Sequence, residues 1–199
     1  MEHVDKLPCE VHLTDGRVVL IRETTLSDEA GLLRFFRGLP KADRLFLRND
    51  VTRPEVAHRL VRDTERMILS LVGESGGEIV ASATLERSRY GWTAHVAEIR
   101  LVVARPFQRM GLAKVMTRFL VQAAPAAGIE KVFMSIPSGK GPLLEAMKRM
   151  GFEEEAVLRR HVKDISGHLR DLHLISNDVS HVWQAVEDLT RDFNPMIDH

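Results

Sequence analysis

The sequence contains one cysteine, Cys9, and no excess of either charge. A single cysteine excludes an intramolecular disulfide and a zinc site made of several cysteines, and it suits a reducing compartment. The 28 basic and 28 acidic residues cancel, so net charge gives no reason to expect a nucleic acid or an anionic membrane as partner. Residues 1–10 lack the apolar stretch of a signal peptide, and no run approaches the roughly 20 apolar residues of a membrane span. We therefore expect a cytoplasmic protein that binds neither nucleic acid nor membrane.

The chain of 199 residues is long enough for one sizeable hydrophobic core and short for two. It has no internal repeat and no low-complexity linker. We expect an N-terminal segment over residues 1–10, one folded domain over residues 11–179 and a helical tail over residues 180–199. The tail carries an apolar stripe that would pack on the domain or on a second copy of the chain as a homodimer; the stripe consists of Val182, Ala185, Val186 and Leu189.

Alternating strand and helix patterns predict a mixed α+β fold. The stretch "VHLTDGRVVLIRET" indicates two strands joined at Asp15-Gly16, and Ser27 resembles the N-cap of a following helix. An apolar run over residues 101–104 indicates a central strand, because both of its faces are apolar. From Leu112 onward the apolar residues recur with the period of a helix. Two long strands are expected at the end of the domain, around a turn near Gly167.

The joint between the central strand and this helix, "VVARPFQRMGLAKVMTRFL", contains a single glycine, Gly111. The first amides of a helix have no intrahelical partner and carry partial positive charge, so they bind anions. Gly111 would let a phosphate approach the backbone, and Arg109 and Lys114 would add charge. The patterns GxxxxGK[ST] and GxGxxG are absent, so neither a typical nucleoside triphosphate nor a nicotinamide dinucleotide is expected.

The six residues Gln108-Arg109-Met110-Gly111-Leu112-Ala113 resemble the Q/R-x-x-G-x-G/A signature of the GNAT superfamily of acyl-CoA-dependent N-acyltransferases. The resemblance extends to "MKRMGF" (Met147–Phe152), where the family usually has a helix that ends in Gly-Phe. It implies a single-domain GNAT fold, with a mixed central sheet of six to seven strands flanked by about four helices. It also implies that acetyl-CoA is the co-substrate and that no metal takes part. The residues assigned to acetyl-CoA are Leu101, Val102, Val103, Gln108, Arg109, Met110, Gly111, Leu112, Ala113 and Lys114.

The resemblance also suggests how the reaction proceeds. Backbone groups near Leu101–Val103 would pair with the pantetheine arm, and an N–H near Val103 would stabilise the oxyanion of the attacked thioester. Two positions depart from the family pattern: Met110 stands where Arg or Lys is frequent, and Met147 stands where a tyrosine often acts as general acid. The only tyrosine, Tyr90, falls in a loop, so the general acid is left unassigned.

Glu98 is the candidate general base, because an attacking amine has to lose a proton and several GNAT enzymes place a glutamate at this point. Strand alternation puts Glu98 and Arg100 on one face. The alternative is therefore an ion pair between these two residues on a solvated strand face.

Three functions remain open from the sequence. The first is acetyl transfer to a protein lysine, the second is acetyl transfer to a small-molecule amine, and the third is a non-catalytic acyl-CoA sensor. A metal site near the C-terminal hairpin is a less favoured idea, because no histidine pair has a helical spacing there; its residues would be His161, His168, His173, Asp164 and Asp171.

Overall fold

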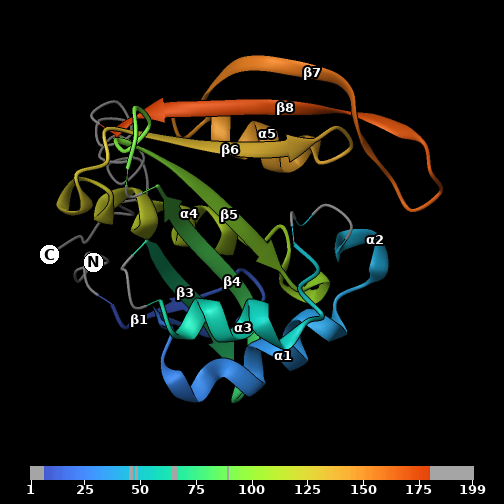
Figure 1. Ribbon diagram of the computed structural model, residues 1–199. Coiled ribbons are helices and arrows are strands. Elements are labelled where there is room, and N and C mark those ends of the chain that lie inside the picture. The colour runs from blue at the N-terminus through green and yellow to red at the C-terminus, as the bar shows by residue number, and fades with distance from the viewer. Residues whose placement is uncertain (1–6, 45–46, 48, 64–66, 89, 180–199) are drawn as a thin grey trace, which may run out of the picture.

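The computed structural model describes residues 7–44, 47, 49–63, 67–88 and 90–179. Within them the chain forms one sheet of eight strands (Figure 1). The strands are β1 (Cys9–His12), β2 (Val18–Glu23), β3 (Ile68–Ser75), β4 (Glu78–Arg87), β5 (Val96–Val103), β6 (Lys131–Pro137), β7 (Glu153–Lys163) and β8 (Leu169–Asp178).

The spatial order of the strands is β1-β2-β3-β4-β5-β6-β8-β7. Every neighbouring pair is antiparallel except β5 and β6, which are parallel. The α+β class expected from the sequence is confirmed. The sheet has eight strands, one more than the upper limit of seven implied by the family resemblance, and both terminal hairpins, β1–β2 and β7–β8, belong to it.

Five α-helices and three short 3-10 helices occur in the described residues, against the four or so helices expected. The helix missed by the sequence pattern is α2, which has only four residues. The α-helices are α1 (Glu29–Gly38), α2 (Lys41–Arg44), α3 (Pro54–Val61), α4 (Leu112–Ala123) and α5 (Gly141–Lys148), and the 3-10 helices are η1 (Leu26–Asp28), η2 (Arg105–Phe107) and η3 (Pro125–Ala127).

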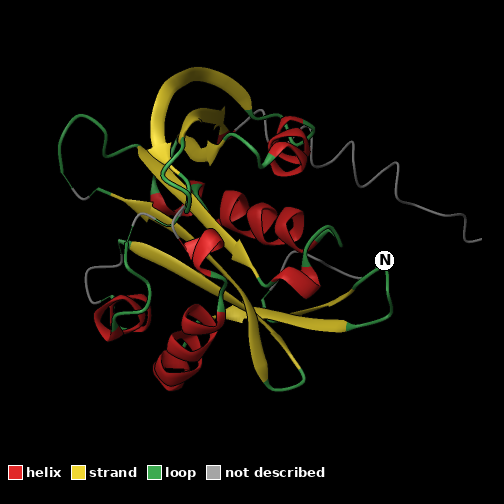
Figure 2. Cartoon of the chain, turned by 90° about the vertical axis from the view of Figure 1, so that its right-hand side faces the viewer, coloured by secondary structure: helices red, strands yellow, loops and turns green. Residues whose placement is uncertain are grey.

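Helices cover the sheet on both faces (Figure 2). On one face α4 and α5 bury side chains such as Met116, Leu120 and Met147 against the strands. On the other face α1 and α3 bury Leu32 and Leu60 against β3 and β5. In Figure 1 these two helices stand in front of β3 and β4, whereas α5 lies behind β6 and β8. The two halves of the sheet are therefore covered differently.

Helix α1 is fixed to the sheet by a carboxylate. Asp28 makes a bidentate ion pair with Arg22 of β2, with N–O distances of 2.7 and 2.8 Å, and it also accepts the backbone N–H of Thr25. The hydrogen bonds from Arg22 lower the pKa of the Asp28 carboxyl to about 2. The helix start thus depends on Thr25 and Asp28, and Ser27, expected to be the N-cap, lies within η1 instead.

The ends of the chain bear on the expected boundaries. β1 begins at Cys9, two residues before the expected start of the domain at residue 11. The C-terminal tail expected over residues 180–199, with its apolar stripe, lies outside the described residues. No helix in the described part of the chain has the length and apolar character to cross a membrane.

Candidate active site

The parallel strands β5 and β6 separate after three paired positions. Their pairing runs from Val96↔Lys131 to Glu98↔Phe133, yet β5 continues to Val103 and β6 to Pro137. Figure 1 shows the two strands diverging toward their carboxyl ends. The other edge of β5 stays paired with β4 up to Val103. Among the described residues, no strand therefore pairs with the Ile99–Val103 edge that faces β6.

Backbone groups of β5 point into this gap, which we call the splay. The N–H of Ala104 donates to the carbonyl of Val80 on β4 at 2.8 Å, and successive residues of a strand point their N–H and C=O groups to opposite sides. The backbone groups of Leu101 and Val103 therefore face away from β4, into the splay. The Gln108 side chain donates to the Val103 carbonyl at 2.8 Å, which agrees with this direction and places the carboxamide at the open end of the splay.

The loop after β5 ends in a left-handed turn that opens helix α4. Gly111, the N-cap of α4, has φ of +87°, and Arg109 has φ of +64°. A Cβ on Gly111 would meet no atom within 4 Å, so the space over the loop is open. No side chain caps the helix, which leaves the amides of its first turn, Leu112 to Lys114, without an intrahelical partner. Such a loop offers several amides to one anion.

Two side chains of the loop point into the protein rather than into this space. Leu112 is 1% exposed and belongs to the core under α4, and Met110 packs against the same core. Any contact of Leu112 with a ligand must therefore come from its backbone.

Arg17, from the turn between β1 and β2, supports the loop from below. Its guanidinium lies 4.0 Å from the centre of the Phe107 ring, donates to the carbonyl of Pro106 and lies 3.3 Å from the sulfur of Met110. Sequence reasoning missed Arg17, because 93 residues separate it from Met110 and no local pattern joins them.

Asp43 of α2 connects the two strand ends on either side of the splay. Its carboxylate accepts Nε of Arg105, which follows β5, at 2.9 Å, and it accepts Nζ of Lys140, which follows β6, at 3.1 Å. Burial alone would raise the pKa of Asp43, but hydrogen bonds from Arg105 and Lys140 outweigh it and the pKa is lowered. This ionised clasp holds the open end of the splay. A hollow of about 360 Å³ beside it is lined in part by Arg105 and Pro106.

Glu98 lies at the narrow end of the splay and belongs to an ionic chain. Arg100 donates to Glu98 at 2.6 Å and to Glu86 of β4 at 3.2 Å, and Arg59 of α3 lies 3.5 Å from Glu86. The ion pair that the sequence left as an alternative is thus present. The face is not an open one, however, since the side chains of Glu98 and Arg100 are only 13% and 22% exposed. Glu86 and Arg59 had no recognisable signal in the sequence.

The sequence model of the acetyltransferase (GNAT) family matches residues 33–152, more than half of the chain. The chain belongs to the GNAT family. No curated protein sequence matches it.

Solved structures of GNAT proteins share its fold. The GNAT domain of S. lividans PAT has 20% sequence identity and a TM-score of 0.68, with 85% of this chain and 96% of that chain covered. A ribosomal-protein-alanine N-acetyltransferase from Brucella melitensis has 21% identity and a TM-score of 0.68, with 80% and 99% covered. A GCN5-related N-acetyltransferase from Kribbella flavida has 18% identity and a TM-score of 0.70, with 80% and 97% covered. At these identities the likeness concerns the fold.

The positions where this GNAT chain departs from the family pattern can now be located. Met147 is completely buried in the core under α5, so it lies away from any reacting group. Tyr90 is 74% exposed, in the loop between β4 and β5. Neither residue supplies a general acid in the splay.

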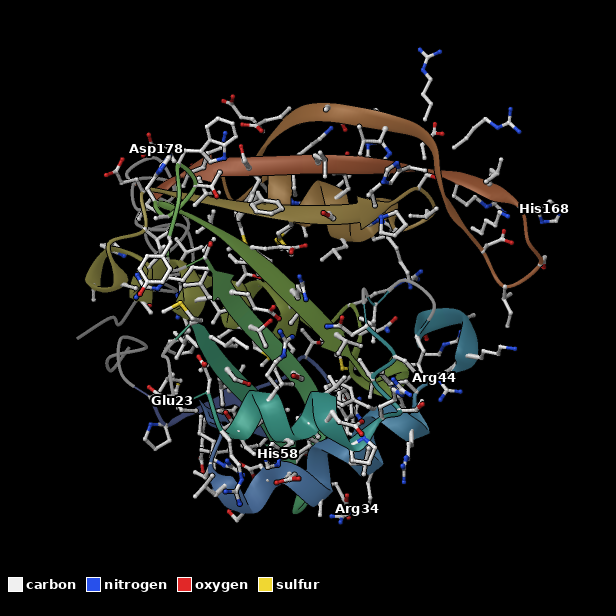
Figure 3. All side chains as sticks on the ribbon, in the orientation of Figure 1. Glu23, Arg34, Arg44, His58, His168 and Asp178 are labelled. Atoms are coloured by element: carbon white, nitrogen blue, oxygen red, sulfur yellow. The ribbon has the colours of Figure 1, made fainter. Side chains whose placement is uncertain are left out.

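The histidines of the C-terminal hairpin are spread apart in this GNAT protein. His173 pairs with Glu154 at 2.6 Å, and His168 lies 3.6 Å from Asp164. Figure 3 shows His168 at the far tip of the hairpin, pointing outward. Among the described residues, no group of three or more His, Cys, Asp or Glu side chains is placed to hold a metal ion.

Proposed function

We propose that this GNAT protein is an N-acetyltransferase that transfers the acetyl group of acetyl-CoA to a primary amine. One observation carries the proposal: the unpaired edge of β5 leads directly into an uncapped helix start. The edge ends at Val103, and the helix start follows at Gly111. The unpaired strand edge can bind an extended thiol arm as it would bind an added strand, and the helix start can bind a diphosphate as an anion. Acetyl-CoA needs these two surfaces in this order.

The residues at the splay fit acetyl-CoA. Backbone groups of Leu101 and Val103 are proposed to bind its pantetheine arm, whereas Val102, which the sequence also assigned to it, turns its backbone groups toward β4. The backbone of the 108–114 loop is proposed to bind its diphosphate, with added charge from Arg109 and Lys114. Arg17 and Asp43 position these surfaces without touching the ligand. When bound, acetyl-CoA supplies an acetyl group activated as a thioester.

Glu98 is proposed as the general base. It accepts the proton of the attacking amine, directly or through a water molecule, as the new C–N bond forms and the C–S bond breaks. Arg100 orients its carboxylate. The N–H of Val103, which points into the splay, stabilises the negative charge that develops on the thioester oxygen. The thiol leaves without a dedicated acid, since a thiol pKa near ~8.5 lets it depart as thiolate.

The identity of the acceptor is inferred from the sequence. The expected acceptor is a lysine side chain of a protein, with a small-molecule amine as the alternative. The proposed mechanism needs no metal, and the single cysteine suits action in the cytoplasm. Sedimentation or light scattering of the full chain tests the homodimer proposed from the C-terminal tail.

Two measurements on the purified full chain test the proposal. Isothermal titration with coenzyme A measures binding, and transfer of label from radiolabelled acetyl-CoA to a panel of protein and small amines measures catalysis. We expect binding together with label on at least one amine. Binding without any transfer would establish the acyl-CoA sensor instead, and absence of binding would overturn the assignment of the splay.

A further inference from the structure

The C-terminal half of the sheet presents apolar side chains on a face that no described helix covers. Along β6 the residues Val132, Met134 and Ile136 point to the core under α4 and α5, so the alternate residues point to the opposite face. The strand register places Leu158 of β7 and Leu172 and Leu174 of β8 on that face as well. We call these four residues the apolar wall: Phe133, Leu158, Leu172 and Leu174.

The apolar wall belongs to neither hydrophobic core. Its side chains are half-buried, and none of them packs in the cluster under α4 and α5 or in the cluster under α1 and α3. In Figure 1, α1 and α3 stand in front of β3 and β4 but do not reach β6 and β8. Within the described part of the chain, the wall is therefore an apolar surface that packs in neither hydrophobic core.

The wall begins beside the proposed base. Phe133 is the register partner of Glu98, at the last paired position of β5 and β6, and partners in a parallel ladder point to the same face. From there the wall continues over Leu174 and Leu172, the register partners of Ser135 and Pro137. An acceptor with its amine at Glu98 would lay the rest of its body along this wall.

Four charged side chains around Arg100, beside the start of the wall, balance one another. Glu98 and Glu86 share the guanidinium of Arg100, and Arg59 also contacts Glu86. These four groups carry no net charge together. A polyamine or a lysine-rich segment binds best where carboxylates exceed cations, and these four groups offer no such excess.

We propose that the apolar wall binds the body of the acceptor, so that the substrate of this site is a primary amine carried on an apolar group. The inference rests on the proposed function, names its substrate class and replaces the protein lysine that the sequence favoured as acceptor. Burying one more methylene on the wall should raise the specificity constant about fourfold, as transfer of a methylene from water does. The same chemistry is offered by a free alkylamine and by an apolar residue at the amino terminus of a peptide.

The test measures kcat/KM with acetyl-CoA for linear primary amines from ethylamine to hexylamine, for spermidine and for a lysine-rich peptide. A tripeptide that begins with leucine and one that begins with glycine distinguish a peptide source from a free amine. We expect kcat/KM to rise about threefold to fivefold per methylene, with spermidine and the lysine-rich peptide well below hexylamine. A flat series, or preference for spermidine or the lysine-rich peptide, overturns the inference.

Variants locate the effect. Leu174→Ala should lower kcat/KM for hexylamine about tenfold and flatten the series, with KM for acetyl-CoA unchanged. Val157→Ala is the matched control, because Val157 lies on the neighbouring strand but pairs with His173, on the opposite face. An equal loss of kcat/KM for hexylamine in both variants would contradict the proposal that the apolar wall binds the acceptor. Should Leu174→Ala fail to fold, the chain-length series of the wild type still decides.

If coenzyme A binds but no amine is acetylated, the proposed function fails. If amines are acetylated without a chain-length trend, only this inference fails.

Discussion

The two sides of β5 differ in which atoms form their surface: backbone atoms on one side and side chains on the other. On the side proposed to bind the cofactor, the surface consists of backbone: the unpaired edge at Leu101 and Val103 and the turn at Gly111. On the side proposed to bind the acceptor, it consists of side chains from separate elements, with Glu98 on β5, Glu86 on β4 and Arg59 on α3. A backbone surface suits a co-substrate that stays the same across a family. A side-chain surface can change with the acceptor while the sheet stays intact.

The largest expected effect concerns Glu98 and tests whether the acceptor side performs the chemistry. In Glu98→Gln the proton acceptor is lost, so kcat should fall by about 10²–10⁴. Affinity for acetyl-CoA, measured by titration, should stay nearly unchanged because the backbone surface is intact.

Glu86→Gln is the matched control, because it removes the other carboxylate from the same guanidinium. It should lower kcat much less. If both variants lose the same activity, the ionic chain matters as a unit and Glu98 is not the base.

The next effect concerns the stability of the fold and tests the ion pair between Asp28 and Arg22, which fixes helix α1 to the sheet. The pKa of Asp28 is lowered from 3.8 to about 2 in the folded protein, so its carboxylate stabilises the fold by about 2 kcal/mol at neutral pH. Because the folded pKa lies below the unfolded one, this contribution is complete above about pH 4 and is lost as the pH falls toward 2. Urea unfolding of wild type and Asp28→Asn should differ at pH 7 and converge at low pH. A difference that persists at pH 2 would show that packing, and not the ion pair with Arg22, is responsible.

A third experiment tests the backbone surface. Valine at Gly111 has to adopt φ of +87°, which costs about 1–2 kcal/mol of stability, and it puts a branched side chain into the space over the loop. Gly111→Val should weaken binding of coenzyme A about tenfold or more.

Gly128→Val is the control for strain alone. Gly128 has φ of +71° and equally open surroundings, but it lies at the other end of α4, after η3. This variant should lose stability and keep its affinity for coenzyme A. A loss of affinity in both variants would mean that strain alone weakens binding.

The smallest effect concerns the clasp that joins both sides. Asp43→Asn keeps the shape and removes the charge that holds Arg105 and Lys140, so KM for acetyl-CoA should rise about two- to fivefold, as for a partly exposed ion pair. Asp164→Asn removes a comparable contact to Arg170 in the distal hairpin and should leave KM unchanged. A similar rise in KM for both variants would refute a specific role for the clasp.

Local patterns predicted the part of the site that is local in sequence. The strand over residues 101–104, the glycine and the following helix lie within 20 residues or so, and their periods and turn residues identify them. Strand alternation likewise placed Glu98 and Arg100 together, two residues apart, where the structure has an ion pair of 2.6 Å. The short helix α2 has only four residues, which is too few for a helical period to be recognised. The N-cap was predicted at Ser27, whereas the capping residues are Thr25 and Asp28.

Contacts across long stretches of chain could not be predicted in this way. Arg17 meets Met110 across 93 residues, and Asp43 meets Arg105 across 62 and Lys140 across 97. The face on which Phe133 points was readable only once its register with Glu98 was known. Each of these depends on which strands become neighbours.

By itself, the sequence determined that this chain forms a mixed sheet with a glycine-containing loop opening a helix, because propensity and periodicity act between residues a few positions apart. Only the tertiary structure decided where β5 and β6 part, which side chains support the loop, and which apolar residues are left outside both cores. Those features arise from the packing of elements that are distant along the chain, and packing is settled only when the whole sheet has assembled.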